Sequence, residues 1–123
     1  MNKLSYSILA IMMMFAACAP SSSEDELIIP QDILQPGEMV DVLTDMQLAE
    51  GALMLKRSHG QPYKKDQERY FNLVFEKHGI TQEYFEESLS FYKNHLFKLD
   101  EIYNKVIKNL ESLRKEVGDS DKK

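Results

Sequence analysis

The chain has 123 residues with 15 basic and 20 acidic side chains, which give a net charge of −5. This length supports one domain, and the acidic balance argues against nucleic-acid binding, which depends on concentrated basic charge. The same balance disfavours adsorption to an anionic lipid surface. Cys18 is the only cysteine, so no intramolecular disulfide is possible, and a folded domain must depend on its hydrophobic core.

Residues 1–17 have the parts of a secretory signal peptide, with Lys3 ahead of an apolar run that is too short to span a bilayer. The stretch Phe15-Ala16-Ala17-Cys18 resembles the lipobox of bacterial lipoproteins, with Phe15 where leucine is commoner. This resemblance implies cleavage before Cys18 and attachment of diacylglycerol to its thiol. We therefore expect a lipoprotein signal peptide over residues 1–17 and a chain anchored to the membrane through lipid on Cys18. The alternative is an ordinary signal peptide followed by an unmodified cysteine.

Residues 18–26 are expected to form the lipidated cysteine and a flexible acidic tether, because they are polar and lack large apolar side chains. Ala19 stands where an aspartate often signals retention in the inner membrane, so we expect the outer membrane. The acidic run 24–26 loosely resembles the export signal of some surface lipoproteins of Bacteroidota, but it lies further from the cysteine. A solvated spacer explains this run equally well, so the periplasmic or surface face stays open.

Residues 27–118 are the expected helical domain. The apolar run 27–30 is expected to lie against the helices as a strap. A first helix is predicted over about residues 36–57, because apolar side chains recur there every three or four positions. The members of this stripe are Met39, Val42, Met46, Ala49 and Leu53, widened by Val40, Leu43 and Leu55. A second helix is predicted over about residues 64–77, ending at Gly79, with Thr81 as the cap of the next one.

The last third of the domain carries apolar residues at alternating spacings of four and three, uninterrupted by glycine or proline. They are Phe85, Leu89, Tyr92, Leu96, Leu99, Tyr103, Val106, Leu110, Leu113 and Val117. This spacing predicts a coiled coil, or one or two helices that pack the stripe on their own domain. We favour the second interpretation, because the first two helices need a partner surface. Asn94-His95 is the expected break, and a charged tail follows over residues 119–123. The predicted fold is a small all-α, up-and-down bundle of three to four helices.

Several segments occur in an order that is shared with one known family. They are Leu27–Pro30, Met39–Glu50, Tyr70–Thr81, Phe85–Tyr92 and Ile102–Val106. In these segments the chain resembles the Bacteroidota lipoprotein family defined by the domain of unknown function 4296, which implies lipoprotein status and a helical fold but no established activity. Gln47 replaces a histidine that is common in the family, which counts against a metal role there. Leu96 falls near a proline that often separates the last two helices, which favours a continuous last helix.

No catalytic arrangement is recognisable in the sequence, which has no glycine-rich phosphate loop and no paired-histidine zinc spacing. We therefore predict no enzyme activity, no cofactor and no metal site. Asp45, Glu50 and His78 could still meet as metal ligands, although a spacing of five does not place the two carboxylates on one helix face. Tyrosines at helical spacing could line a groove, or form core edges. The candidate ligand or partner surface comprises Asp45, Glu50, Tyr70, His78, Tyr92 and Tyr103.

The leading functional hypothesis is a non-catalytic interaction module: an accessory lipoprotein of the cell envelope that binds an envelope protein. Its contact surface is expected on the heptad-bearing last helix or on the first helix, which carries Met39, Met46 and Met54. The alternative is a small-ligand- or metal-binding lipoprotein with a cavity between Asp45, Glu50, Tyr70 and His78. A large exposed apolar patch would favour the module, and a closed polar pocket would favour the binder.

Overall fold

The computed structural model describes residues 27–120, which form four helices and contain no strand. The helices are α2 (Pro36–Ser58), α3 (Lys64–His78), α4 (Gln82–Lys93) and α5 (Leu96–Ser120). The prediction of a small all-α bundle is therefore confirmed. The predicted signal peptide, Cys18, the acidic tether and the end of the charged tail lie outside the described residues.

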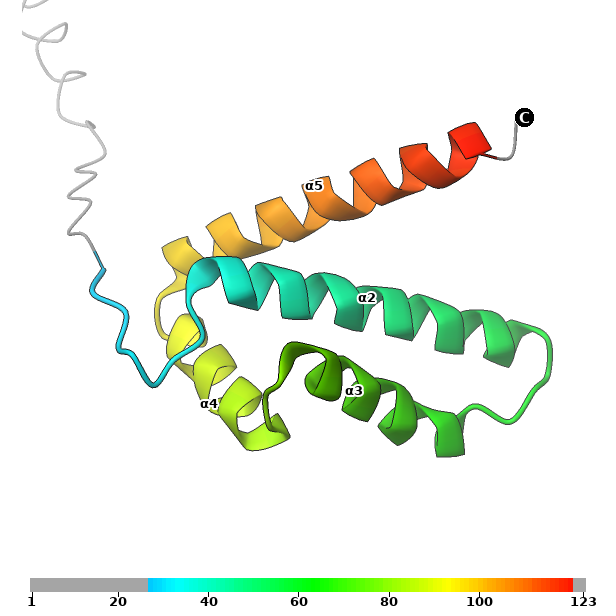
Figure 1. Cartoon of the computed structure of the whole chain (residues 1–123), viewed down its shortest axis with the longest axis horizontal. Helices are drawn as coiled ribbons and strands as arrows, with labels where there is room; N and C mark the ends of the chain where they lie inside the picture. The colour runs from blue at the N-terminus through cyan, green and yellow to red at the C-terminus, as the bar shows by residue number, and fades with distance from the viewer. Residues whose placement is uncertain (1–26, 121–123) are drawn as a thin grey trace, which may run out of the picture.

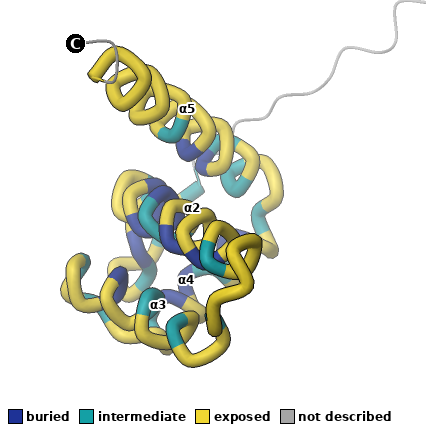
Figure 2. Tube along the Cα trace, turned by 90° about the vertical axis from the view of Figure 1, so that its right-hand side faces the viewer, coloured by how far each residue is buried: buried dark blue, intermediate teal, exposed yellow. Residues whose placement is uncertain are grey.

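α2 is the central helix of the bundle. It lies between α3, which returns beside it as an antiparallel hairpin, and α5, which runs in the same direction on its opposite side (Figure 1). The view turned by 90° shows the same order of α5, α2 and α3 (Figure 2), and α4 lies at one end of the bundle (Figure 1). A helix that lies between two others must carry apolar residues on more than one side. The buried residues of α2 are Met39, Val40, Val42, Leu43, Thr44, Ala49 and Leu53.

Local signals in the sequence set the helix ends. Pro36 occupies the first turn of α2, and the backbone N–H of Gln35 donates to Glu38 Oε2 at 2.8 Å. Gly79 ends α3 with a φ of +64°, a conformation that glycine adopts without a steric cost. The hydroxyl of Thr81 then accepts the backbone N–H of Tyr84 at 3.1 Å and caps α4. No helix within the described part of the chain is long and apolar enough to cross a bilayer.

The chain breaks at the predicted position, between α4 and α5. Asn94 Nδ2 lies 3.2 Å from the carbonyl oxygen of Ser90, and His95 Nδ1 lies 2.8 Å from that of Phe91. The Asn94 side chain thereby gives the Ser90 carbonyl a partner, and the Phe91 carbonyl accepts the backbone N–H of Asn94 at 3.1 Å in addition to its contact with the His95 ring. The break therefore forms with a leucine, not a proline, at position 96. The expectation that Leu96 favours a continuous last helix was wrong.

Because of this break, the apolar stripe predicted from Phe85 to Val117 does not form one surface. Its α4 part packs in the core, but Leu96 and Tyr103 are exposed on α5. Ile102 is buried in their place, so the core face of α5 follows Leu99, Ile102 and Val106. Because α5 runs in a different direction from α4, a different side of α5 packs against the core. This happens even though the spacing of apolar residues continues unchanged from one helix to the next.

The segment that precedes α2 is fixed to α4 by a pair of hydrogen bonds, which we call the Leu34 clamp. Leu34 is buried, its N–H donates to Ser88 Oγ at 2.9 Å, and its carbonyl oxygen accepts the hydroxyl of Tyr92 at 2.6 Å. In the strap predicted over residues 27–30, Ile29 packs partly against the core, whereas Ile28 is exposed. The main anchor of this segment therefore lies four residues beyond the predicted strap.

We expect Tyr92→Phe to lower the free energy of unfolding by about 1–3 kcal/mol, because it leaves the buried Leu34 carbonyl without a partner. Urea unfolding followed by circular dichroism measures this change. Tyr103→Phe is the matched control, since its ring is partly exposed on α5, and it should stay within about 0.5 kcal/mol of the wild type. Equal effects of the two substitutions would mean that the clamp contributes nothing to stability.

Candidate functional site

Two of the predicted candidate residues meet where α2 faces the end of α3. Asp45 Oδ2 accepts from His78 Nε2 at 2.6 Å and from Lys77 Nζ at 2.7 Å. Partial burial acts to raise the pKa of Asp45, but the hydrogen bonds and charges of Lys77 and His78 outweigh it and hold this pKa below its ordinary value. The cluster therefore ties α3 to the central helix through one carboxylate oxygen of Asp45, which Lys77 and His78 share.

Glu50 lies apart from this cluster. Its carboxylate accepts from Gln47 Nε2 at 3.3 Å on the exposed surface of α2. A five-residue step turns a side chain well away from its starting face, so Asp45 can face α3 while Glu50 does not. Among residues 27–120, no group of three or more histidine, cysteine, aspartate or glutamate side chains is placed to hold a metal ion.

The three candidate tyrosines lie on three different helices and do not line one groove. Tyr70 of α3 is half-buried, with Lys56 Nζ 5.4 Å from its ring centroid. Tyr92 of α4 is fully buried, and burial raises the pKa of its hydroxyl to about 12, with further contributions from Glu38 and Tyr84. Tyr103 is partly exposed on α5, which lies on the other side of α2 from α3. The tyrosines therefore serve separate contacts.

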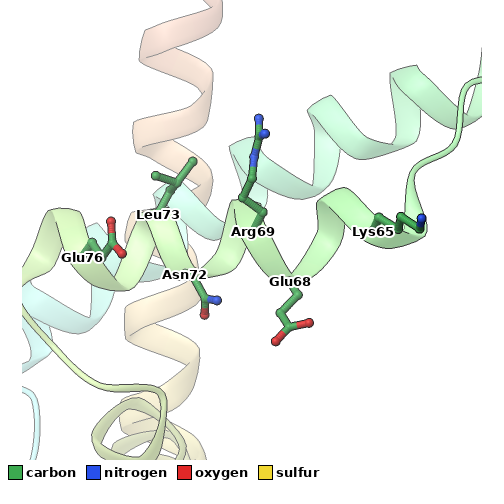
Figure 3. Close-up of a pocket in the computed structure, with 6 residues that line it drawn as sticks. All are labelled: Lys65, Glu68, Arg69, Asn72, Leu73 and Glu76. Atoms are coloured by element: carbon green, nitrogen blue, oxygen red, sulfur yellow. The ribbon is translucent and has the colours of Figure 1, made fainter.

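Two surface depressions involve α3, and neither is lined by any of the six candidate residues. One is an open groove of about 450 Å³ between α3 and α4. Its apolar part consists of Met46, Phe71, Phe75 and Phe85, and its polar part of Lys64, Gln67, Glu68, Asn72, Gln82 and Glu86. The other lies on α3 alone, where the six lining side chains extend from a single helix in different directions (Figure 3). No buried side-chain nitrogen or oxygen within the described chain lacks a hydrogen-bond partner, so neither depression presents an unpaired buried group to a ligand.

α2 and α5 diverge toward the C-terminal end of α5 (Figure 1), and both helices carry exposed large apolar side chains there. On α2, Asp45 and Lys56 pair with residues of α3, and Leu48 and Leu55 lie roughly 70–90° around the helix from that side. Along α2 the exposed fraction rises from 5% at Val40 and 7% at Thr44 to 47% at Leu48 and 61% at Leu55. The beginning of the helix is therefore covered, whereas Leu48 and Leu55 are open to solvent.

α5 shows the same gradient. Ile102 and Val106 are 1% and 2% exposed, whereas Leu113 and Val117, which continue on the same side of the helix, are 38% and 62% exposed. Leu110 between them is half-buried. We call these diverging residues the splayed face: Leu48 and Leu55 of α2, and Leu110, Leu113 and Val117 of α5. Both sets of residues are exposed beyond the buried residues that precede them on the same helix.

The fold and its surfaces thus define a small helical domain whose notable feature is an open apolar face. Comparison with protein families gives a match over residues 30–116 to the domain of unknown function DUF4296. The chain belongs to this family. Searches against curated proteins and solved structures gave no match.

Several residues that shape these sites carry no strong local signal in the sequence. Lys77 is adjacent to His78 in the sequence. A carboxylate that faces the C-terminal end of a helix attracts any cationic side chain at that end. Ile102 is one position from Tyr103, and the three- and four-residue spacing of Leu99, Ile102 and Val106 could have indicated its burial. Leu34 and Ser88 become recognisable only once the segment before α2 is placed against α4.

We expect Asp45→Asn to destabilise the domain by about 1–2 kcal/mol at neutral pH, because it removes the charge that Lys77 and His78 share. The folded state depresses the pKa of Asp45, so it binds fewer protons than the unfolded state, and this stabilisation is lost as the pH falls below the ordinary value of 3.8. Urea unfolding at pH 7 and at pH 3 measures the difference. Asp41→Asn, on the exposed side of α2, is the control and should show little pH-dependent difference from the wild type. A constant difference between Asp45→Asn and the wild type at both pH values would contradict the assignment.

Proposed function

We propose that the protein is a lipid-anchored, non-catalytic interaction module of the bacterial cell envelope, whose splayed face docks on a protein. The observation that carries the proposal is the set of exposed apolar residues on the diverging parts of α2 and α5. Contiguous apolar surface on a small domain commonly marks a protein-interaction site, because exposure to water is otherwise unfavourable. These residues lie on the two helices where the sequence predicted a contact surface.

The attachment to the membrane rests on the sequence. The lipobox-like stretch ending at Cys18 supports a bacterial lipoprotein, the resemblance to the family supports an origin in Bacteroidota, and Ala19 supports the outer membrane. Two or more acyl chains hold a protein on a bilayer much more firmly than one, because each buried methylene contributes about 0.8 kcal/mol. Residues 19–26 would then separate the anchor from the helices. Whether the domain faces the periplasm or the cell surface is left open by this proposal.

The arrangement of the other candidate residues supports docking over ligand binding. Asp45 pairs with His78, Glu50 is exposed, and Tyr70 lies beneath Lys56, so these four side chains do not surround a common cavity. A closed polar pocket at this position would have supported a small-ligand or metal-binding lipoprotein.

Replacing the lipidated thiol tests the anchor directly. We expect the wild-type chain to remain with membranes through salt washing and to be extracted by detergent, whereas Cys18→Ser stays unprocessed or washes off. Ser21→Ala, in the same segment, is the matched control and should fractionate as the wild type does. Mass spectrometry of the N-terminal peptide measures the modification. A wild-type protein recovered free of membranes with an unmodified Cys18 would overturn the anchoring.

A further inference from the structure

We propose that the end of the domain nearest the tether rests in the surface of a lipid bilayer through three exposed apolar side chains. They belong to Ile28, Leu96 and Phe97, which we call the proximal tip. The inference rests on the membrane anchor of the proposed function and adds a second contact with the same membrane. The splayed face, at the opposite end of the domain, stays free for a protein.

The proximal tip holds three of the four most exposed large apolar side chains among residues 27–120. Ile28 is 88% exposed, Leu96 72% and Phe97 71%, and only Met54 of α2, at 73%, is comparable. Leu96 and Phe97 are consecutive in the first turn of α5, whereas the side of that helix that packs on the core begins at Leu99. Adjacent uncovered apolar side chains at one end of a small domain indicate a contact with something less polar than water.

The proximal tip lies at the end of the bundle from which the chain leads toward the proposed anchor. The turn between α4 and α5 and the beginning of the described chain both lie at the left of Figure 1. The Leu34 clamp joins them, because Leu34 is bonded to Ser88 and Tyr92 of α4. Ile28 is six residues before Leu34, and Leu96 is four residues after Tyr92. Both parts of the tip therefore lie on the anchored side of the domain.

The length of the connection keeps the proximal tip close to any membrane that holds Cys18. Nine residue steps separate Cys18 from Leu27. A chain spans at most about 3.5 Å per residue, so Leu27 lies no more than about 30 Å from the lipidated residue. A link of this length gives a second contact an effective concentration of about a millimolar or more. A patch too small to bind a free domain to a membrane can therefore stay occupied once the anchor is in place.

The side chains around the tip favour insertion driven by apolar burial. Leucine and phenylalanine are typical of segments that bury their apolar side about 5–10 Å into the boundary of headgroups and acyl chains. Lys93 and Lys98 flank Leu96 and Phe97, and a lysine stem can follow an apolar surface while its ammonium stays among the headgroups. Lys98 already pairs with Glu101, and the chain carries a net charge of −5, so attraction to anionic lipid does not drive the contact. We therefore expect it in neutral phosphatidylcholine and at high salt.

Quenching of a fluorescent probe by lipid tests the contact in the full lipidated chain. Cys18 is the only cysteine, and lipid consumes its thiol, so Leu96→Cys supplies a single site for a polarity-sensitive probe. The processed protein is reconstituted in phosphatidylcholine vesicles in which some lipids carry a nitroxide just below the headgroup. We expect blue-shifted emission and strong quenching at position 96, both unchanged by high salt. Met54→Cys is the matched control, because Met54 is as exposed as Leu96 but lies near the far end of α2, and its probe should be quenched much less.

A second substitution tests whether apolar side chains hold the tip in the lipid. Phe97→Asp, with the probe at position 96, replaces the burial of an aromatic ring by a charge. The ratio of lipid-contacting to free tips should fall roughly tenfold, and the quenching should approach that at position 54. Phe97→Leu keeps an apolar side chain and should retain most of the quenching. The first turn of α5 has no acidic residue and favours one, so circular dichroism of Phe97→Asp should match the wild type.

The remaining outcomes separate this inference from the proposed function. Equally weak quenching at positions 96 and 54, in protein that stays with the vesicles, would overturn the lipid contact and leave the anchor intact. Strong quenching at position 96 that Phe97→Asp does not change would mean that the short connection alone places the probe near lipid, and would also overturn the contact. Processed protein that does not stay with the vesicles would overturn the proposed anchor, and the lipid contact with it.

Discussion

The fold depends on one constraint: α2 must bury apolar side chains on two opposite sides. Its α3 side is closed by Ala49, Leu53 and the pairing of Asp45 with His78, and its α5 side by Val40 and Thr44. A single helix cannot satisfy both sides, so α3 and α5 must lie across α2 from each other. The short α4 makes this possible, because it carries the chain from one side of α2 to the other at one end of the bundle. Phe85 of α4 packs on Phe75 of α3 with 5.5 Å between ring centroids and joins that end to the core.

The same constraint explains why an apolar face is left open. Helices on opposite sides of α2 gain no support from each other, so nothing holds the far end of α5 against the bundle. At the other end, the Leu34 clamp joins the segment before α2 to α4 and satisfies both backbone groups of a buried residue. The proposed membrane anchor would therefore be attached at the end of the domain that the Leu34 clamp stabilises, and the splayed face would lie at the opposite end. This separation suits a module that is held at one end and binds at the other.

Local sequence features were sufficient to predict the helices and their limits. Gly79, Thr81 and the pair Asn94-His95 act on neighbouring backbone groups, and the ends that they predict agree with the structure within about two residues. The mutual placement of Asp45 and His78 was also foreseen as one possibility. Contacts between distant segments were not predictable, because Leu34 meets Ser88 and Tyr92 across 54 and 58 residues. The periodic spacing placed Leu113 and Val117 on the apolar face of the last helix. It does not reveal whether another helix covers that face.

Amide hydrogen exchange of the dilute protein tests most directly whether α5 is packed against α2 only near the crossing. The account predicts that amides around Ile102 and Val106 exchange as slowly as those of central α2, whereas amides of residues 111–120 exchange by local fraying at much lower free energy. Uniformly strong protection along α5 at a concentration where the chain is monomeric would contradict the account. It would mean that α2 already covers the whole helix within one molecule.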